Sequence, residues 1–473
     1  MKRTVFFALS AGAALGASSL AWGADMPRKA PYYKAPAPVA YDWTGFYAGV
    51  NVGYGVGRDP SSFVAPTLPS FETFDLAPAG VIGGIGAGYN WQLGNWVLGV
   101  EGDFQGSDQR DSQTCIDLCT PLRSLTVEQK LPWFATLRGR IGYATGPLLF
   151  YYTGGLAYGR VESNLTETAG AGTTTPFSFS TDRAGWTIGS GVEAALGGNW
   201  TGKAEYLYLD LGSVNNAFNF QGVTNTYSTS VRDNIFRAGL DYRFGGPAAP
   251  ALATWQPPAF NWTGFYVGAN VGTGVARNPT TANLAGNPER FNLTPNGWLG
   301  GVQAGYNWQN GHLVAGIETD VQWSGLSDSN TCLFTCTATQ FATFDQKLEW
   351  FGTTRARLGY AMGPALFYAT GGVAYGTIKT DIAANFGTGT QLFDFRETKT
   401  GWTAGGGVET PVSFPSFVPL LSSIHGLTSK TEYLYVDLGS TTDSFSLLGA
   451  NPVTSSFHTH IIRTSLSYKF GAY

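Results

Sequence analysis

The sequence has few charged residues, few histidines and, after its N-terminal stretch, no long apolar run. Only 13% of the 473 residues are charged, and there are 3 Met and 4 His. No run of 18 or more apolar residues occurs beyond the N-terminus, which excludes a transmembrane helix there. The formal net charge of −4 gives no polybasic surface of the kind that binds nucleic acid.

The scarcity of histidine argues against an enzyme. All four His lie in the second half of the chain, whereas acyl transfer and hydrolysis usually need a His beside a nucleophile or carboxylate. His458 and His460 share one strand face and could contact haem or a metal; a solvated loop end is the alternative. We predict no catalytic residue, no metal site and no cofactor.

The four cysteines form two similar pairs, Cys115 with Cys119 and Cys332 with Cys336. Each pair falls in a long connection between strands that the pattern described below predicts to be extracellular. Exported proteins meet oxidising conditions, so we expect one local disulfide in each pair. A metal site is the alternative, but no His lies near either pair.

What the sequence does contain is 64 Gly, 14 Trp, 23 Tyr and 31 Phe. This composition indicates β structure that faces something other than water on one side. Residues 43–57 (WTGFYAGVNVGYGVG) show the pattern. Phe46, Val50 and Val52 belong to an apolar set, and Asn51 and Gly53 to the alternate set of mostly small or polar residues. Successive strand residues point to opposite faces, so we predict a strand with one apolar face.

Eight such strands follow one another, joined alternately by long and short connections. The long connections of the first repeat include predicted loops at residues 58–79 and 163–183. This asymmetry is typical of outer-membrane barrels, which have tight periplasmic turns and larger extracellular loops. The whole pattern then repeats with an offset of 216 to 219 residues over most of its length, as in WTGFY at Trp43 and Trp262. The offset becomes 227 after an insertion within residues 411–427.

The predicted organisation has five parts. Residues 1–23 resemble a signal peptide, with Lys2 and Arg3 before an apolar segment. Residues 24–41 form a Pro/Ala-rich periplasmic arm, and residues 246–260 a Pro-rich periplasmic linker. The fold class is all-β: two tandem eight-stranded antiparallel up-and-down transmembrane β-barrels, residues 42–245 and 261–473. One sixteen-stranded barrel is the alternative.

Charged residues fall on the face opposite the apolar one, hence inside the predicted barrels. This avoids the roughly 2–4 kcal/mol that a charge costs on the lipid side at mid-membrane. We expect them to form ion pairs, as either a structural polar plug or a gate for water and small ions. The predicted network comprises Glu101, Asp103, Arg138, Arg140, Glu193, Lys203, Glu205 and Arg237, and in the second repeat Glu318, Asp320, Arg355, Arg357, Glu409, Lys430, Glu432 and Arg463.

Aromatic residues mark the strand ends. We predict that several tryptophans form membrane-interface girdles: Trp43, Trp91, Trp96, Trp133, Trp186 and Trp200. Phe470, in phase with the last strand, is the predicted recognition residue for barrel assembly, with Tyr473 as the terminal aromatic alternative.

Several ordered motifs carry a resemblance to a known family. They are WFATLRGRIGYA with WFGTTRARLGYA, GGLAYG with GGVAYG, GWTIGSGVE, KAEYLYLDLGS and the final YRF and YKF strands. The chain resembles the small OmpA-like outer-membrane β-barrel proteins of alphaproteobacteria, also called porin-family or outer-membrane immunogenic proteins. The resemblance implies an eight-stranded barrel per repeat in the outer membrane; the tandem arrangement departs from it.

The expected function is that of an integral outer-membrane protein with a structural or surface role and at most a narrow, gated pore. A general diffusion porin built as one sixteen-stranded barrel is one alternative. A surface adhesin or haem-binding protein acting through its loops is another. The expected partners are outer-membrane lipid and lipopolysaccharide, the barrel assembly machinery, and small ions or solutes in the lumen.

Overall fold

The computed structural model describes residues 41–65, 70–120, 123–169, 173–220, 222–245, 260–284, 287–337, 340–362, 365–387, 389–412, 426–446 and 450–471. The predicted signal peptide, nearly all of the periplasmic arm and linker, most of the 411–427 insertion, and Tyr473 lie outside these residues. Within them the secondary structure is strand without helix, so no helix there could cross a membrane.

The described residues of the first repeat form ten strands. They are β1 (Gly45–Gly57), β2 (Asp59–Ala65), β3 (Ser70–Leu76), β4 (Ala79–Leu93), β5 (Trp96–Thr120), β6 (Arg123–Thr145), β7 (Leu148–Ala169), β8 (Thr173–Gly197), β9 (Trp200–Phe220) and β10 (Val223–Phe244).

The described residues of the second repeat form eleven. They are β11 (Gly264–Ala276), β12 (Asn278–Leu284), β13 (Asn287–Leu293), β14 (Asn296–Asn310), β15 (Leu313–Ser324), β16 (Ser327–Thr337), β17 (Gln340–Met362), β18 (Ala365–Phe386), β19 (Gln391–Pro411), β20 (Leu427–Ser446) and β21 (Ala450–Lys469).

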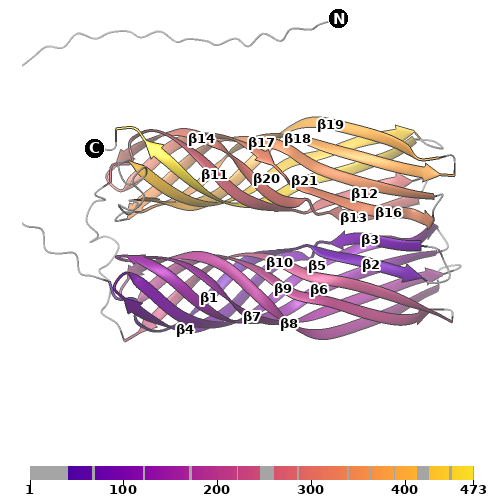
Figure 1. Ribbon diagram of the computed structural model, residues 1–473, viewed down its shortest axis with the longest axis horizontal. Helices are drawn as coiled ribbons and strands as arrows, with labels where there is room; N and C mark the ends of the chain where they lie inside the picture. The colour runs from indigo at the N-terminus through magenta and orange to yellow at the C-terminus, as the bar shows by residue number, and fades with distance from the viewer. Residues whose placement is uncertain are drawn as a thin grey trace, which may run out of the picture. The chain divides into compact units, whose positions relative to one another are not determined.

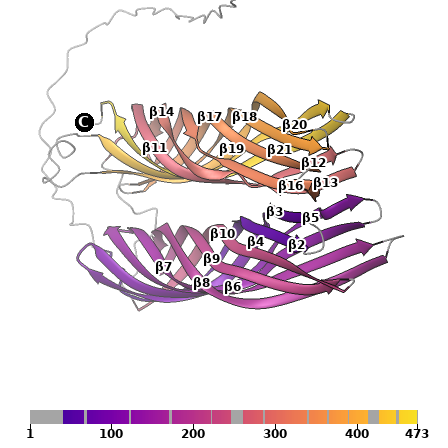
Figure 2. The ribbon, with the colours of Figure 1, turned by 45° about the vertical axis from the view of Figure 1, so that its right-hand side comes forward.

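Each repeat is closed by its own strands. β1 pairs with β10 in the register Phe46↔Phe244, and its other edge pairs with β4. β11 likewise pairs with β21, in the register Val267↔Tyr468, and with β14. The pairings are antiparallel, and Figures 1 and 2 show the tilted strands of each repeat wrapping around a barrel. A single sixteen-stranded barrel would instead need β1 beside β21; among the described residues β1 pairs with β10 and β11 with β21.

Twenty-one strands form two sets of eight because some barrel strands are interrupted. β1 and β2 are separated only by Arg58, and β2 continues along β10. β3 and β4 are separated by Ala77 and Pro78. The predicted long loops at residues 58–79 and 163–183 are therefore mostly strand, and that prediction is wrong. Ser62, Asn164, Thr166, Ser178 and Ser180 face outward along these segments, and such residues occur in loops as often as on the wet face of a strand.

The outer surface carries an apolar belt about as tall as a membrane. Leu137, Tyr152 and Ile188 are more than half exposed, as expected for side chains that meet lipid. On β6, Trp133 and Tyr143 bound this belt. Ten residues of strand at about 3.3 Å each, tilted by about 40°, span about 25 Å, the height of the apolar band in outer-membrane barrels.

Two aromatic girdles bound the belt of the first repeat. Trp91, Trp96 and Trp200 are about half exposed near the short turns, and Trp186 is equally exposed at the opposite boundary. The prediction for Trp43 is wrong: its side chain is completely buried. Trp43 precedes β1, and alternation cannot determine the direction of a side chain before the strand begins.

Glycines form the tight turns at one end of the first barrel, here called the short-turn end. Gly94, Gly146 and Gly198 have φ of 64°, 62° and 58°, a left-handed conformation that glycine adopts without steric cost. Each lies in a two-residue connection between antiparallel strands. The opposite end of the barrel is called the long-hairpin end.

Leu137→Arg tests the membrane belt. Leu137 lies about midway between Trp133 and Tyr143, so the variant should lose about 2–4 kcal/mol of folding free energy in lipid. Urea titration in liposomes, read by gel mobility, measures this loss. Thr126→Arg on the same strand, outside the belt, should change stability little; equal losses in the two variants would contradict the assigned belt.

Candidate functional site: the filled lumen

Arg138 is the centre of the charge network in the first barrel. It projects inward from β6, and its side chain is fully buried. Its Nη2 donates to Glu101 Oε1 at 2.5 Å and to Asp103 Oδ2 at 2.8 Å, while Nη1 donates to Glu205 Oε1 at 2.9 Å. Nε donates to the Thr136 hydroxyl at 2.9 Å. One guanidinium therefore joins carboxylates from β5 and β9.

Two further bases, Arg237 and Lys203, extend this network. Arg237 contacts Glu205 at 2.6 Å and Asp103 at 3.0 Å. Lys203 Nζ lies 3.2 Å from Glu101 Oε2 and 3.1 Å from Asp241 Oδ2. These groups are nearly or fully buried, and a buried ion pair is stable only when both partners are well hydrogen-bonded.

Arg140 forms a second centre closer to the short-turn end. Its Nη2 donates to Glu193 Oε2 at 2.7 Å, and its Nη1 donates to the Tyr47 hydroxyl at 3.0 Å. Its guanidinium carbon lies 4.2 Å from the centre of the Tyr151 ring, a cation–π distance. The Tyr47 hydroxyl donates to Glu101 Oε2 at 2.7 Å and so links Arg140 to the cluster around Arg138.

The second barrel contains the corresponding network. Arg355 contacts Glu432 at 2.9 Å and Asp320 at 3.0 Å. The remaining contacts are Arg355 with Glu318, Arg463 with Asp320 and Glu432, Arg357 with Glu409, and Lys430 with Glu318. All sixteen charged residues selected from the sequence thus lie in two buried clusters, each with four of the selected acids and four of the selected bases.

Sequence reasoning missed the tyrosines and one acid of these clusters. Tyr47 and its counterpart Tyr266 belong to the set of alternate residues that includes the small and polar ones. This position in their strands could have indicated that both rings point into the lumen. Tyr151 and Tyr368 lie on strands that are aromatic on both faces, so alternation does not show which ring points inward. Asp241 is on the inward face of β10, but its counterpart in the second barrel is Ser467. The second copy of the sequence therefore gives no indication that an acid at this position belongs to the ion network.

Inward glycines leave the space that these side chains occupy. A Cβ on Gly53 would lie 2.7 Å from Arg237 Cβ, and one on Gly272 would lie 2.6 Å from Arg463 Cβ. Real Cβ atoms do not approach this closely. The glycines of the opening strands are therefore required by the inward arginines of the closing strands.

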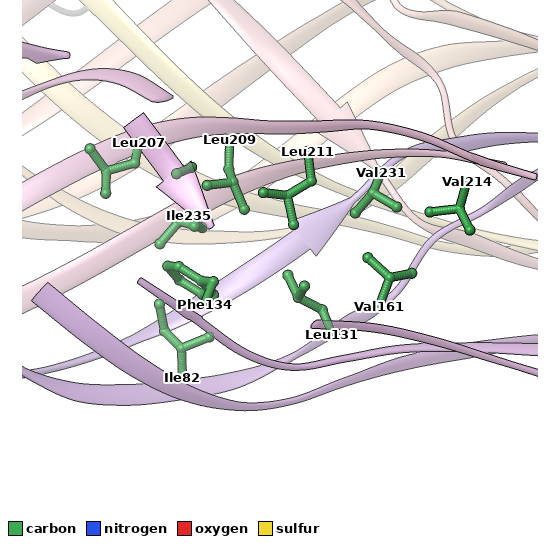
Figure 3. Close-up of a cluster of buried hydrophobic side chains, with 11 residues drawn as sticks. Ile82, Leu131, Phe134, Val161, Leu207, Leu209, Leu211, Val214, Val231 and Ile235 are labelled. Carbon is green, nitrogen blue, oxygen red and sulfur yellow. The ribbon is translucent and has the colours of Figure 1, made fainter. Parts of the chain in front are cut away.

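An aliphatic layer fills the first lumen next to the ion network, toward the long-hairpin end. Leu207 and Ile235 are the next inward residues after Glu205 and Arg237, and both are fully buried. Figure 3 shows their side chains converging with those of Ile82 and Phe134. The complete buried cluster is Ile82, Leu131, Phe134, Ala157, Val161, Leu207, Leu209, Leu211, Val214, Val231 and Ile235. A corresponding cluster around Phe351 and Leu434 fills the second lumen.

Beyond this layer the first lumen is polar and then apolar again. Gln129 Nε2 donates to Asp59 Oδ2 at 2.6 Å. Burial raises the pKa of the Asp59 carboxyl well above its usual range. In the second barrel Asn278 occupies the corresponding position and donates to Gln346. Further buried aromatic and aliphatic clusters follow in both barrels, around Phe63 in the first and around Phe291, Phe344 and Phe445 in the second.

Trp43 covers the first lumen at the short-turn end. Its backbone N–H donates to Gln92 Oε1 at 2.6 Å, and its indole N–H donates to the Gly146 carbonyl at 3.2 Å. The Tyr41 ring packs edge-on against it at 4.8 Å between centroids. In the second repeat Trp262 is equally buried and packs against Phe260. An aromatic lid therefore lies below each ion network.

The two neighbouring histidines lie on the outer face of β21, not at a loop end. His458 Nδ1 lies 3.0 Å from the Tyr435 hydroxyl, and His460 Nδ1 lies 2.8 Å from the Tyr433 hydroxyl. The solvated-loop interpretation is therefore wrong for both. Among the described residues no group of three or more His, Cys, Asp or Glu could hold a metal ion.

The roles predicted for the four cysteines and for Phe470 stay predictions. The side chains of Cys115, Cys119, Cys332 and Cys336 lie outside the described residues, so the two disulfides remain predictions. Phe470 is half exposed and packs edge-on against Tyr468 at 5.0 Å. Its role in assembly remains a prediction as well.

A closed antiparallel barrel with an apolar outer belt, aromatic girdles and a polar, ion-paired interior is an integral membrane β-barrel. The family model for the outer membrane protein beta-barrel domain matches residues 30–244 and again residues 246–470. The chain therefore belongs to the outer membrane β-barrel protein family, with two tandem copies of the domain, and it is located in the outer membrane. This confirms the family resemblance.

Characterised relatives match a length close to one repeat. The 31 kDa outer-membrane immunogenic protein of Brucella melitensis biotype 1 is 42% identical over 246 residues, covering 50% of this chain and 98% of the relative. The 22 kDa outer membrane protein of Rhizobium leguminosarum bv. viciae is 31% identical over 213 residues, covering 45% and 82%. Among solved structures, Neisserial surface protein A is similar with a TM-score of 0.23 and 16% identity, covering 42% of this chain and 98% of its own.

Arg138→Gln tests the ion network. The variant leaves Glu101, Asp103 and Glu205 buried without their shared cation, so the free energy of unfolding should fall by about 3–5 kcal/mol. Urea unfolding followed by tryptophan fluorescence and gel mobility measures the change. The matched variant Arg355→Gln should cause a similar loss in the second barrel.

Arg160→Gln provides the control for this test. Arg160 pairs with Asp182 on the outer surface, where both side chains are substantially exposed. Exposed ion pairs contribute little to stability, so this variant should unfold like the wild type. If Arg160→Gln lowered the free energy of unfolding as much as Arg138→Gln, the stability could not be attributed to the buried ion network.

Proposed function

We propose that this protein is a closed outer-membrane barrel pair with a structural, surface-exposed role, and that neither lumen acts as a diffusion pore. The observation that carries the proposal is the sequence of layers in each lumen. An aromatic lid, an ion network and an aliphatic cluster occupy successive levels of the barrel. A permeating solute would have to displace all three.

The gate alternative is weakened by how the charges are held. Arg138 contacts three carboxylates and Arg237 contacts two at 3.0 Å or less. A gate that exchanges partners would leave at least one buried charge unpaired during the exchange, which is costly. Even with the ion pairs rearranged, Phe134 and Leu207 would still present an apolar barrier. We therefore expect at most rare passage of water or small ions.

A surface role is favoured by the length of the strands. β8 has 25 residues and β6 has 23, whereas about 9–11 residues are enough to cross the membrane. The additional residues extend both barrels toward the long-hairpin end, which we assign to the outside of the cell. The word "immunogenic" in the names of several relatives fits such exposure.

The partners follow from the same assignment. The apolar belt would contact outer-membrane lipid and lipopolysaccharide, and Phe470 at the end of the last strand would be read by the barrel assembly machinery. Adhesion or haem capture by the hairpin tips remains the second candidate, favoured by the extended strands. Catalysis is not part of the proposal.

Planar-bilayer recording of the full-length protein tests the closed lumen. We expect no large, long-lived conductance steps from the wild-type protein. Steps comparable to those of a general diffusion porin would overturn the proposal. The variant Phe134→Ala/Phe351→Ala thins the aliphatic layer of both barrels but leaves the ion networks intact, so it should also stay closed to large solutes.

A further inference from the structure

The long-hairpin end of each repeat has two strand edges that are not paired with each other. β4 pairs with β5 through the membrane belt. Beyond the membrane belt, toward the long-hairpin end, no backbone pairing joins β3 to β5, or β13 to β16, within the described segments of these strands. Unpaired edges expose N–H and C=O groups that readily pair with another strand.

These edges pair across the two repeats. β3 pairs with β16 at Thr73↔Thr331, and β5 pairs with β13 at Thr114↔Arg290. β3 and β13 have equivalent positions in their repeats, and so do β5 and β16. The two contacts are therefore reciprocal, as in an isologous interface related by a two-fold axis.

Two ion pairs repeat this reciprocity. Arg58 Nη2 lies 3.0 Å from Asp328 Oδ1, and Arg277 Nη2 lies 2.8 Å from Asp111 Oδ1. Arg58 corresponds to Arg277, and Asp111 corresponds to Asp328, in the two copies of the sequence. Both aspartate side chains are almost fully buried, while the arginines are one quarter to one third exposed.

One difference between the copies adds a second acid to the first of these pairs. Arg58 Nη2 also contacts Asp75 Oδ2 at 3.0 Å, whereas the corresponding residue of the second repeat is Asn292, a neutral amide that donates to Asp111 Oδ1. Burial raises the pKa of Asp75 to about 7, and the neighbouring Asp328 carboxylate adds to the rise.

Aromatic side chains continue the contact on outward faces that would otherwise meet lipid. The Tyr54 ring stacks on His460 at 5.7 Å between centroids, and Phe236 lies 4.8 Å from Tyr433. These residues come from β1 and β10 of the first barrel and from β20 and β21 of the second. The outward-facing side chains of His460 and Tyr433 therefore contact aromatic rings of the first barrel.

We propose that the two barrels of one chain dock on each other as a pseudo-two-fold pair, through the crossed strand edges, the Arg58–Asp328 and Arg277–Asp111 ion pairs, and the aromatic contact around Tyr54 and His460. The occupant of each docking face is the other repeat of the same chain. The protein is then a covalently tethered counterpart of a barrel dimer, a property separate from whether its lumens conduct.

Photo-cross-linking of the full-length protein in native outer membranes tests this docking. A benzophenone amino acid at Tyr54 should cross-link within one chain to the β20–β21 peptides that contain Tyr433 and His460, as identified by mass spectrometry. The same probe at Tyr152, exposed on β7, is the control and should give no cross-link to the second repeat. Equal yields at the two positions, or cross-links from Tyr54 only to lipid or to another chain, would overturn the proposal.

Charge reversal identifies the ion pair as part of the interface. In the Tyr54 probe protein, Arg58→Glu should lower the intrachain cross-link yield several-fold, because it places an acid beside Asp75 and Asp328. Adding Asp328→Arg should restore much of the yield. Gel mobility of the unheated protein verifies that both barrels are folded in each variant; an unchanged yield in a folded Arg58→Glu variant would contradict the assigned contact.

Discussion

The burial of charge inside a narrow lumen is the constraint on which the rest of the structure depends. An isolated charge there is costly to maintain, and the eight bases of the two ion networks each have at least one carboxylate within ion-pair distance. Arg138 meets this requirement with acids from β5 and β9, and Arg237 uses two of the same acids. The register of β5, β6, β9 and β10 is therefore fixed by one shared network. A shift of one residue in any of them would turn its charges toward lipid.

The same network explains the composition of the opening strand. Large inward arginines can be accommodated only where the facing strand has no side chain in the way, and Gly53 and Gly272 supply that space. Tyr47 is the one large residue of this face of β1, and its hydroxyl bridges Glu101 and Arg140. Glycine and tyrosine at alternate positions of one strand are thus consequences of the charges opposite them.

The fold class could be predicted from the sequence because it depends on a period of two. Alternation separates the lipid face from the lumen, and the sixteen charged residues that it selects are buried inside the two barrels. Alternation does not determine where a strand leaves the membrane, since Ser and Thr suit strands and loops alike; it therefore predicts loops at residues 58–79 and 163–183, where the structure has mostly strand. It also says nothing about a residue before a strand begins, so it cannot show that Trp43 belongs to the lid and not to a girdle.

The aliphatic layer was missed for a related reason. Leu207, Ile235 and Phe134 face the same side as the arginines, and a rule that places apolar residues toward lipid cannot recognise apolar residues inside a barrel. Their position becomes understandable once the long strands are seen to continue beyond the membrane belt. There the outer face meets water, so polar residues point outward and the lumen becomes an ordinary hydrophobic core. Each barrel is thus a membrane protein over one part of its height and a water-soluble β-barrel over the other.

This change of environment also bears on the duplication. In lipid, a barrel has no exposed strand edge, because closure pairs every strand. Beyond the membrane belt, no backbone pairing joins β3 to β5 or β13 to β16 within the described residues, so each repeat taken alone has an unpaired strand edge. Two separate chains would cover these edges only at sufficient concentration, whereas a short tether sets an effective concentration in the millimolar range. In the fused chain, the strand edge that a single copy leaves unpaired always has the other repeat nearby to pair with. This gives a physical reason for the tandem arrangement.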